Sequence, residues 1–135
     1  MNPITPSILL SILSIGLASA DAALTVKVAE PKLVGQKAVI QLTMKNTFKE
    51  KVESARAQLF LIDDQGKVVG QAARWVIGGT KGKPALSPDK EVTFNFVVQT
   101  GKPFTKSKVS FSRVVLEGGK LADVNKEVQI QNVEK

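Results

Sequence analysis

The sequence from residue 24 onward contains several short stretches in which apolar side chains occupy every second position. This two-residue period sends alternate side chains to opposite faces of an extended strand, so that one face can be buried and the other solvated. The stretches are separated by Gly, Pro, Asn and Asp, which favour turns, and none has the spacing of an amphipathic helix. The pattern therefore predicts an all-β fold.

The alternation predicts about seven strands. They cover residues 24–29, 37–45, 54–62, 67–77, 92–99, 108–117 and 123–131. Residues 63–66 (DDQG) predict a hairpin turn between the third and fourth strands. Short strands spaced by turn signals favour an immunoglobulin-like or fibronectin III-like antiparallel β-sandwich with Greek-key connections, with a small barrel as the alternative. The first and last strands are the expected edges of the sheets.

The first 20 residues are of a different kind. Residues 8–17 form an apolar core of about ten residues, too short to span a bilayer of ~30 Å. The small residues Ala18, Ser19 and Ala20 follow, as at a signal peptidase site. We expect a signal peptide cleaved after Ala20 and a single soluble domain over residues 21–135, in the periplasm or secreted. Because residues 1–7 lack Lys and Arg, an uncleaved anchor is the alternative.

Strict alternation also assigns individual side chains to faces. Trp75 has the same parity as Ala73 and Ile77, so it is expected in the core, with Arg74 and Val76 facing outward. A contact on the sheet face is the alternative for Trp75.

Arg56 and Arg113 also lie inside predicted strands, where each could pair with a neighbouring acid on a solvated face. In the sixth stretch, alternation groups Arg113 with Val109 and Phe111. Neither arginine is predicted to bind a ligand.

The residue inventory argues against catalysis. The chain has no His, Cys or Tyr, so it lacks the usual general base, thiol nucleophile and imidazole or thiolate metal ligands. A lysine that acts as a base must be buried and neutral, whereas pairs such as Ser87 with Lys90 or Ser107 with Lys106 lie among other charges in predicted loops. We therefore expect that the protein is not an enzyme and binds no cofactor.

Two other motifs are better explained as turns and connectors than as sites. Asp63 and Asp64 are adjacent and have no third acid at ligand spacing, which argues against a metal site. Residues 78–83 (GGTKGK) are one residue short of a phosphate-binding loop, and Pro84 stands where that loop needs Ser or Thr.

Charge is the remaining signal. Nineteen Lys plus Arg against 12 Asp plus Glu give a net charge of +7, which favours anionic partners. Because alternate loops of a sandwich lie at opposite ends, one end is expected to collect several lysines that could contact an anion. These are Lys49, Lys51, Lys81, Lys83, Lys90, Lys120 and Lys126. Acids are interspersed among them, so a generally basic surface is the alternative to a weak anion-binding face.

Three segments of the central part resemble a known family. They are KNT (45–47), AQLFLIDDQGKVVG (57–70) and LSPDKEVTF (86–94). Their order is similar to that of the FxLYD-type immunoglobulin-like domain of bacteria and archaea, over roughly residues 37–98. Ile62 stands where the family name has Tyr, and Asp89 where Gly is commoner. The resemblance implies an accessory or interaction module outside the cytoplasm and assigns no functional positions.

Together these observations predict an exported, non-catalytic interaction or accessory module. Its expected partner is another envelope or extracellular protein, bound through loop tips or an exposed strand edge. One alternative is a basic adhesion module for anionic wall polymer, polysaccharide or a lipid surface. Another is a proteinase inhibitor or chaperone-like sandwich. Nucleic acid is not expected, because the basic loops hold few aromatic residues for stacking.

Overall fold

The computed structural model describes residues 24–132, and the predicted signal peptide, residues 1–20, lies outside the described residues. The described chain forms eight strands and one short 3-10 turn. They are β1 (Leu24–Val28), β2 (Lys32–Val34), β3 (Lys37–Asn46), β4 (Val52–Ile62), β5 (Val68–Ile77), β6 (Glu91–Gln99), β7 (Lys106–Leu116), η2 (Glu117–Gly119) and β8 (Val128–Asn132). No described helix is long and apolar enough to cross a membrane.

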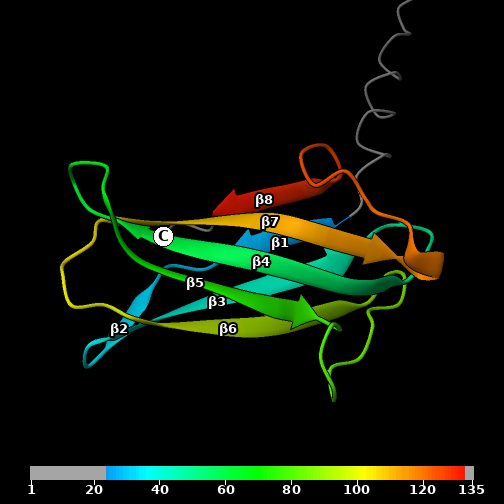
Figure 1. Cartoon of the computed structure of the whole chain (residues 1–135), viewed down its shortest axis with the longest axis horizontal. Helices are drawn as coiled ribbons and strands as arrows, with labels where there is room; N and C mark the ends of the chain where they lie inside the picture. The colour runs from blue at the N-terminus through cyan, green and yellow to red at the C-terminus, as the bar shows by residue number, and fades with distance from the viewer. Residues whose placement is uncertain (1–23, 133–135) are drawn as a thin grey trace, which may run out of the picture.

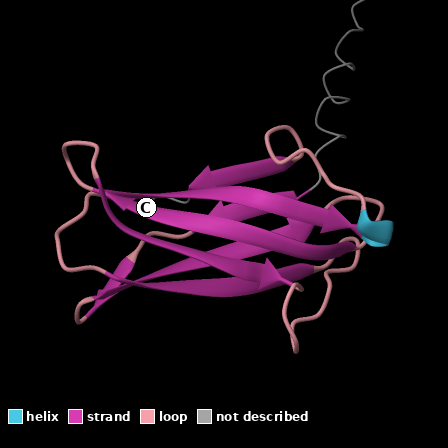
Figure 2. Cartoon of the chain, in the orientation of Figure 1, coloured by secondary structure: helices cyan, strands magenta, loops and turns pink. Residues whose placement is uncertain are grey.

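The strands form two sheets packed face to face, so the predicted all-β sandwich is confirmed (Figures 1 and 2). In the five-stranded sheet, β3 pairs with β6 on one side and with both β1 and β2 on its other side. The outer side of β1 pairs with β8. The three-stranded sheet has the order β5–β4–β7 and lies in front in Figure 1.

The core lies between the two sheets and follows the predicted alternation. Leu24, Ile40 and Phe96 point into it from the five-stranded sheet, and Leu59 and Leu61 from the three-stranded sheet. All five side chains are almost fully buried. Burial of a side chain of this size contributes about 1.5–3 kcal/mol, so these inward faces hold the sheets together.

Two expectations about strand position are corrected, and one further strand was not expected. β1 is not an edge, because it lies between β3 and β8, and its pairing with β8 is parallel. The last strand, β8, begins only at Val128, because residues 123–127 form a turn. In this turn the Asp123 carboxylate accepts a hydrogen bond from Asn125 N–H. The short, fully exposed β2 was not predicted, because it has no buried face to produce alternation.

Two β-bulges meet at Arg56 and change the parity of the neighbouring strands. Arg56 pairs with Trp75 of β5, yet the adjacent Ala55 pairs with Ile77, so Val76 is an extra residue. Trp75 therefore shares the outer face with Arg56, while Val76 and Ile77 are both buried. The core position expected for Trp75 and the outward position expected for Val76 are wrong.

The second bulge is in β7. Arg56 pairs with Arg113 and the next residue, Ala57, pairs with Phe111, which leaves Ser112 as the extra residue. Phe111 and Val114 both face the core, and Arg113 is exposed beside Arg56. Arg113 is thus on the opposite face from Phe111, contrary to strict alternation. A bulge re-aims side chains in this way because it adds one residue to one strand only.

Asn46, at the end of β3, is a fully buried polar residue that joins two loops. Its Nδ2 donates to the carbonyl oxygens of Glu50 and Leu86, both at 2.9 Å, and its Oδ1 accepts from Phe48 N–H at 2.8 Å. Its backbone C=O also accepts from Asp89 N–H at 2.7 Å. The side chain thereby holds residues 46–51 and 86–90 against each other.

We predict that Asn46→Ala lowers the free energy of unfolding by about 2–3 kcal/mol, because it removes the three side-chain hydrogen bonds of a fully buried residue that joins two loops. Asn46→Asp keeps the shape and the acceptor but cannot donate, so it should be at least as destabilising. Urea unfolding measures both. A loss below about 0.5 kcal/mol for either variant would contradict this role.

Candidate functional site

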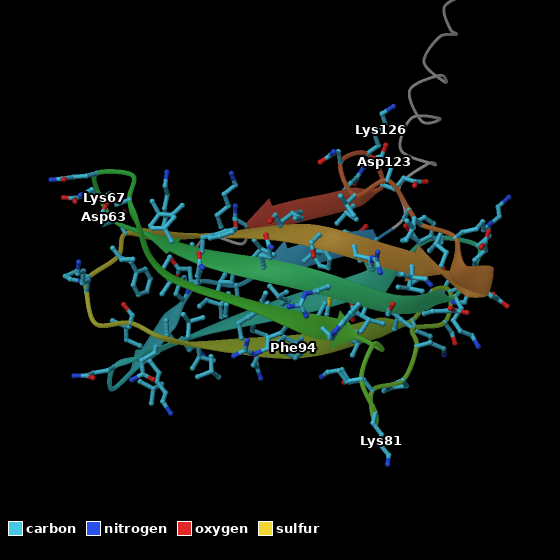
Figure 3. The ribbon with its side chains drawn as sticks, viewed as in Figure 1. Asp63, Lys67, Lys81, Phe94, Asp123 and Lys126 are labelled. Atoms are coloured by element: carbon cyan, nitrogen blue, oxygen red, sulfur yellow. The ribbon has the colours of Figure 1, made fainter. Side chains whose placement is uncertain are left out.

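The loops that carry the seven predicted lysines do lie at one end of the sandwich. Residues 46–51 contact the 86–90 loop through Asn46, and Glu117 N–H donates to the carbonyl oxygen of Lys51. The lysines themselves do not converge. Lys81 and Lys126 point away from each other on opposite sides of the molecule (Figure 3).

Two of these lysines have partners within the chain, and the end as a whole carries mixed charge. Lys120 forms an ion pair with Glu50, and the Lys83 ammonium lies 4.8 Å from the centroid of the Phe94 ring. The others, Lys49, Lys51, Lys81, Lys90 and Lys126, are exposed. The loops and strand ends here also hold Glu53, Asp89, Glu91, Glu117, Asp123 and Glu127. This mixture argues against a concentrated anion site at this end.

The outer face of the three-stranded sheet concentrates positive charge more strongly. Two of the three arginines of the chain, Arg56 and Arg113, lie on this face, whereas Arg74 pairs with the buried Ala57 and belongs to the opposite face of the sheet. Because directly paired residues point to the same face, the register places Trp75, Arg56 and Arg113 in one row across β5, β4 and β7. We call these three residues the arginine row.

Further along the same face, the register sets Phe60 between Gln71 and Lys108, and Gln58 between Ala73 and Ser110. We call this surface the basic face. It consists of the arginine row together with Gln58, Phe60, Gln71, Ala73, Lys108 and Ser110. Adjacent rows are about 7 Å apart, because two residues of a strand rise by that distance.

Trp75 orients Arg56 within the row. The guanidinium carbon of Arg56 lies 5.5 Å from the centroid of the Trp75 ring, within the range of a cation–π interaction. Gly79 packs so closely against the same indole that a Cβ at this glycine would lie 2.4 Å from Trp75 Cδ2. A guanidinium stacked on an aromatic ring keeps its N–H donors in its own plane, available for bidentate contact with an anion.

The guanidinium groups of the row have no acidic partner among residues 24–132. Glu53 is the one acid within β4, β5 and β7, and its carboxylate accepts a hydrogen bond from Gly118 N–H beyond the sheet. The pairing with a neighbouring acid that the sequence allows for Arg56 and Arg113 is therefore not found within the described residues. Two like charges directly opposite each other are unfavourable, so a bound anion would relieve this repulsion.

The remaining motifs have structural roles. The Asp63 carboxylate accepts hydrogen bonds from the N–H groups of Gln65 and Lys67, which closes the predicted hairpin turn. Gly78 N–H donates to the Pro84 carbonyl oxygen, so residues 78–84 are tied as a connector. Within the described part of the chain, no group of three or more acidic residues could hold a metal ion.

Comparison with known proteins identifies a shared fold but no family. No family model and no curated protein matches the chain. Among solved structures, a candidate ApaA protein of Bordetella pertussis is similar over 73% of this chain and 84% of its own, with 20% sequence identity and a TM-score of 0.53. This similarity supports the sandwich fold alone.

Two further structures are more distantly similar. IrmA of Escherichia coli has 11% identity and a TM-score of 0.47, covering 84% of this chain and 94% of its own. A structural-genomics target has 18% identity and a TM-score of 0.47, covering 73% and 76%.

Sequence reasoning missed the arginine row because it assumed unbroken alternation. One signal was nevertheless present, because the strands that contain the arginines contain almost no acids. A charge count per strand identifies the basic sheet, although only the register shows that Arg56 and Arg113 share a face.

We predict that Gly79→Ala displaces Trp75, because the new methyl group would overlap the indole. Trp75 is the single tryptophan, so its emission reports the change directly, with a shift to longer wavelength as the ring becomes more solvated. Gly82→Ala is the matched control, since Gly82 also has a positive φ, +87°, but no atom within 4 Å of the added Cβ. Identical emission spectra for the two variants would contradict the packing described here.

Proposed function

We propose that this protein is an exported, non-catalytic binding module, in the periplasm or secreted, that engages an anionic partner through the basic face. One observation carries the proposal. Arg56 and Arg113 lie side by side on an outer sheet face with no carboxylate to neutralise them among the described residues. Attraction of an anion to such a face is the expected physical consequence.

The proposal includes an immunoglobulin-like sandwich of the FxLYD type. Supporting it, the chain crosses between the sheets after β3, β5, β6 and β7, as Greek-key connections do. Asp89 adopts φ +66°, in the left-handed region that favours Gly, at the position where the family commonly has Gly. The leader, cleaved after Ala20, supplies the export signal in this proposal.

Other partner classes have less support. A protein partner bound by strand addition has β2, β5, β6, β7 and β8 as available edges, but nothing in their sequence selects among them. An inhibitor or chaperone-like role requires a loop or edge that inserts into a client, and no described loop has a distinguishing feature of that kind.

The test is a titration of the purified protein with polyglutamate, followed by Trp75 emission, at ~20 mM and at ~0.5 M salt, where charge attraction is largely screened. We expect binding at low salt that is lost at high salt. Arg56→Gln combined with Arg113→Gln should weaken it about tenfold, since each exposed contact contributes up to about 1 kcal/mol.

The matched control combines Lys81→Gln with Lys126→Gln. This pair removes the same net charge from the loop end of the molecule, where the two lysines point apart (Figure 3). We expect it to weaken binding less than about twofold. Equal losses for the two double variants would mean that general net charge, and not the basic face, attracts the polyanion. That result would overturn the proposal.

A further inference from the structure

A shallow hollow in the basic face has the character of a sugar subsite. It lies between β4 and β5, has a volume of about 330 Å³, and is lined by Gln58, Phe60, Gln71, Ala72 and Ala73. The small side chain of Ala73 makes room between Trp75 and Gln71, its neighbours on the same face of β5. The volume is sufficient for one pyranose ring.

The lining combines an apolar surface with free amides. Phe60 is half-buried and belongs to the outer face, where its ring can contact the C–H groups of a sugar. The side-chain amides of Gln58 and Gln71 have no hydrogen bond to the described residues, and each offers both donors and an acceptor. Hydroxyl groups of a saccharide require this mixture of donors and acceptors.

Cations lie on two sides of the hollow. The arginine row is one row away from Gln58, about 7 Å along β4, and Lys108 lies directly opposite Phe60. An acidic substituent on a sugar in the hollow would be within reach of the Arg56 guanidinium, which Trp75 holds in place. Charge complementarity thus favours an acidic sugar over a neutral one.

We propose that the basic face binds an acidic polysaccharide, with one sugar ring in the hollow and its carboxylate or sulfate groups on Arg56, Arg113 and Lys108. This inference rests on the proposed function and names the ligand class for the same face. A single-stranded nucleic acid fits less well, because it needs several exposed aromatic platforms, whereas the Trp75 ring is in contact with both Arg56 and Gly79.

The test compares a sulfated, uronic acid-containing hexasaccharide derived from heparin with polyglutamate of similar charge, again by Trp75 emission. Ala73→Leu fills the hollow without changing any charge. We expect it to weaken hexasaccharide binding by at least about tenfold and polyglutamate binding by less than about twofold. Thr93→Leu, on the exposed face of β6 in the other sheet, is the control and should change neither.

The outcomes separate the two proposals. If Ala73→Leu leaves both affinities unchanged while the double arginine variant lowers both, the face attracts anions generally, and the saccharide inference is wrong although the proposed function stands. If neither polyanion binds the wild-type protein at low salt, both proposals fail. Hexasaccharide binding that survives the double arginine variant would likewise exclude this face as the site.

Discussion

The two β-bulges that meet at Arg56 are the constraint on which the site depends. Each adds one residue to a neighbour of β4, Val76 in β5 and Ser112 in β7. Apolar residues on the far side of each bulge thereby reach the core, while Trp75 and Arg113 align with Arg56 on the outer face. Without the bulges, Trp75 would share the face of Ile77 and Arg113 the face of Phe111, so the same local irregularity completes the core and assembles the row.

The electrostatics of the row follow from this geometry. Arg56 and Arg113 face each other without a carboxylate within the described strands, an arrangement that opposes folding slightly. The Trp75 ring stabilises one guanidinium through its face, and Gly79 fixes that ring because no larger residue fits against it. The folded protein therefore retains electrostatic repulsion between the two guanidinium groups. A bound anion would reduce this repulsion, which favours binding at the basic face.

Alternation predicted most of the strands and the inward faces of residues such as Leu59 and Phe96, because burial of one face is a local property of the sequence. It could not predict that β1 lies inside its sheet, since alternation reports faces and not neighbours. The position of Trp75 was missed for a related reason. A bulge is set by the register between strands, so Trp75 and Arg113 could be assigned to a face only after pairing was known.

The central claim is that Trp75, Arg56 and Arg113 are directly paired across three strands. Backbone NOEs in the isotopically labelled protein test it most directly, because directly paired residues bring their backbone protons close together. The account predicts contacts from Arg56 to Trp75 on one side and to Arg113 on the other. Contacts from Arg56 to Ser112, or from Arg56 to Val76, would instead show a different register and contradict the assembled row.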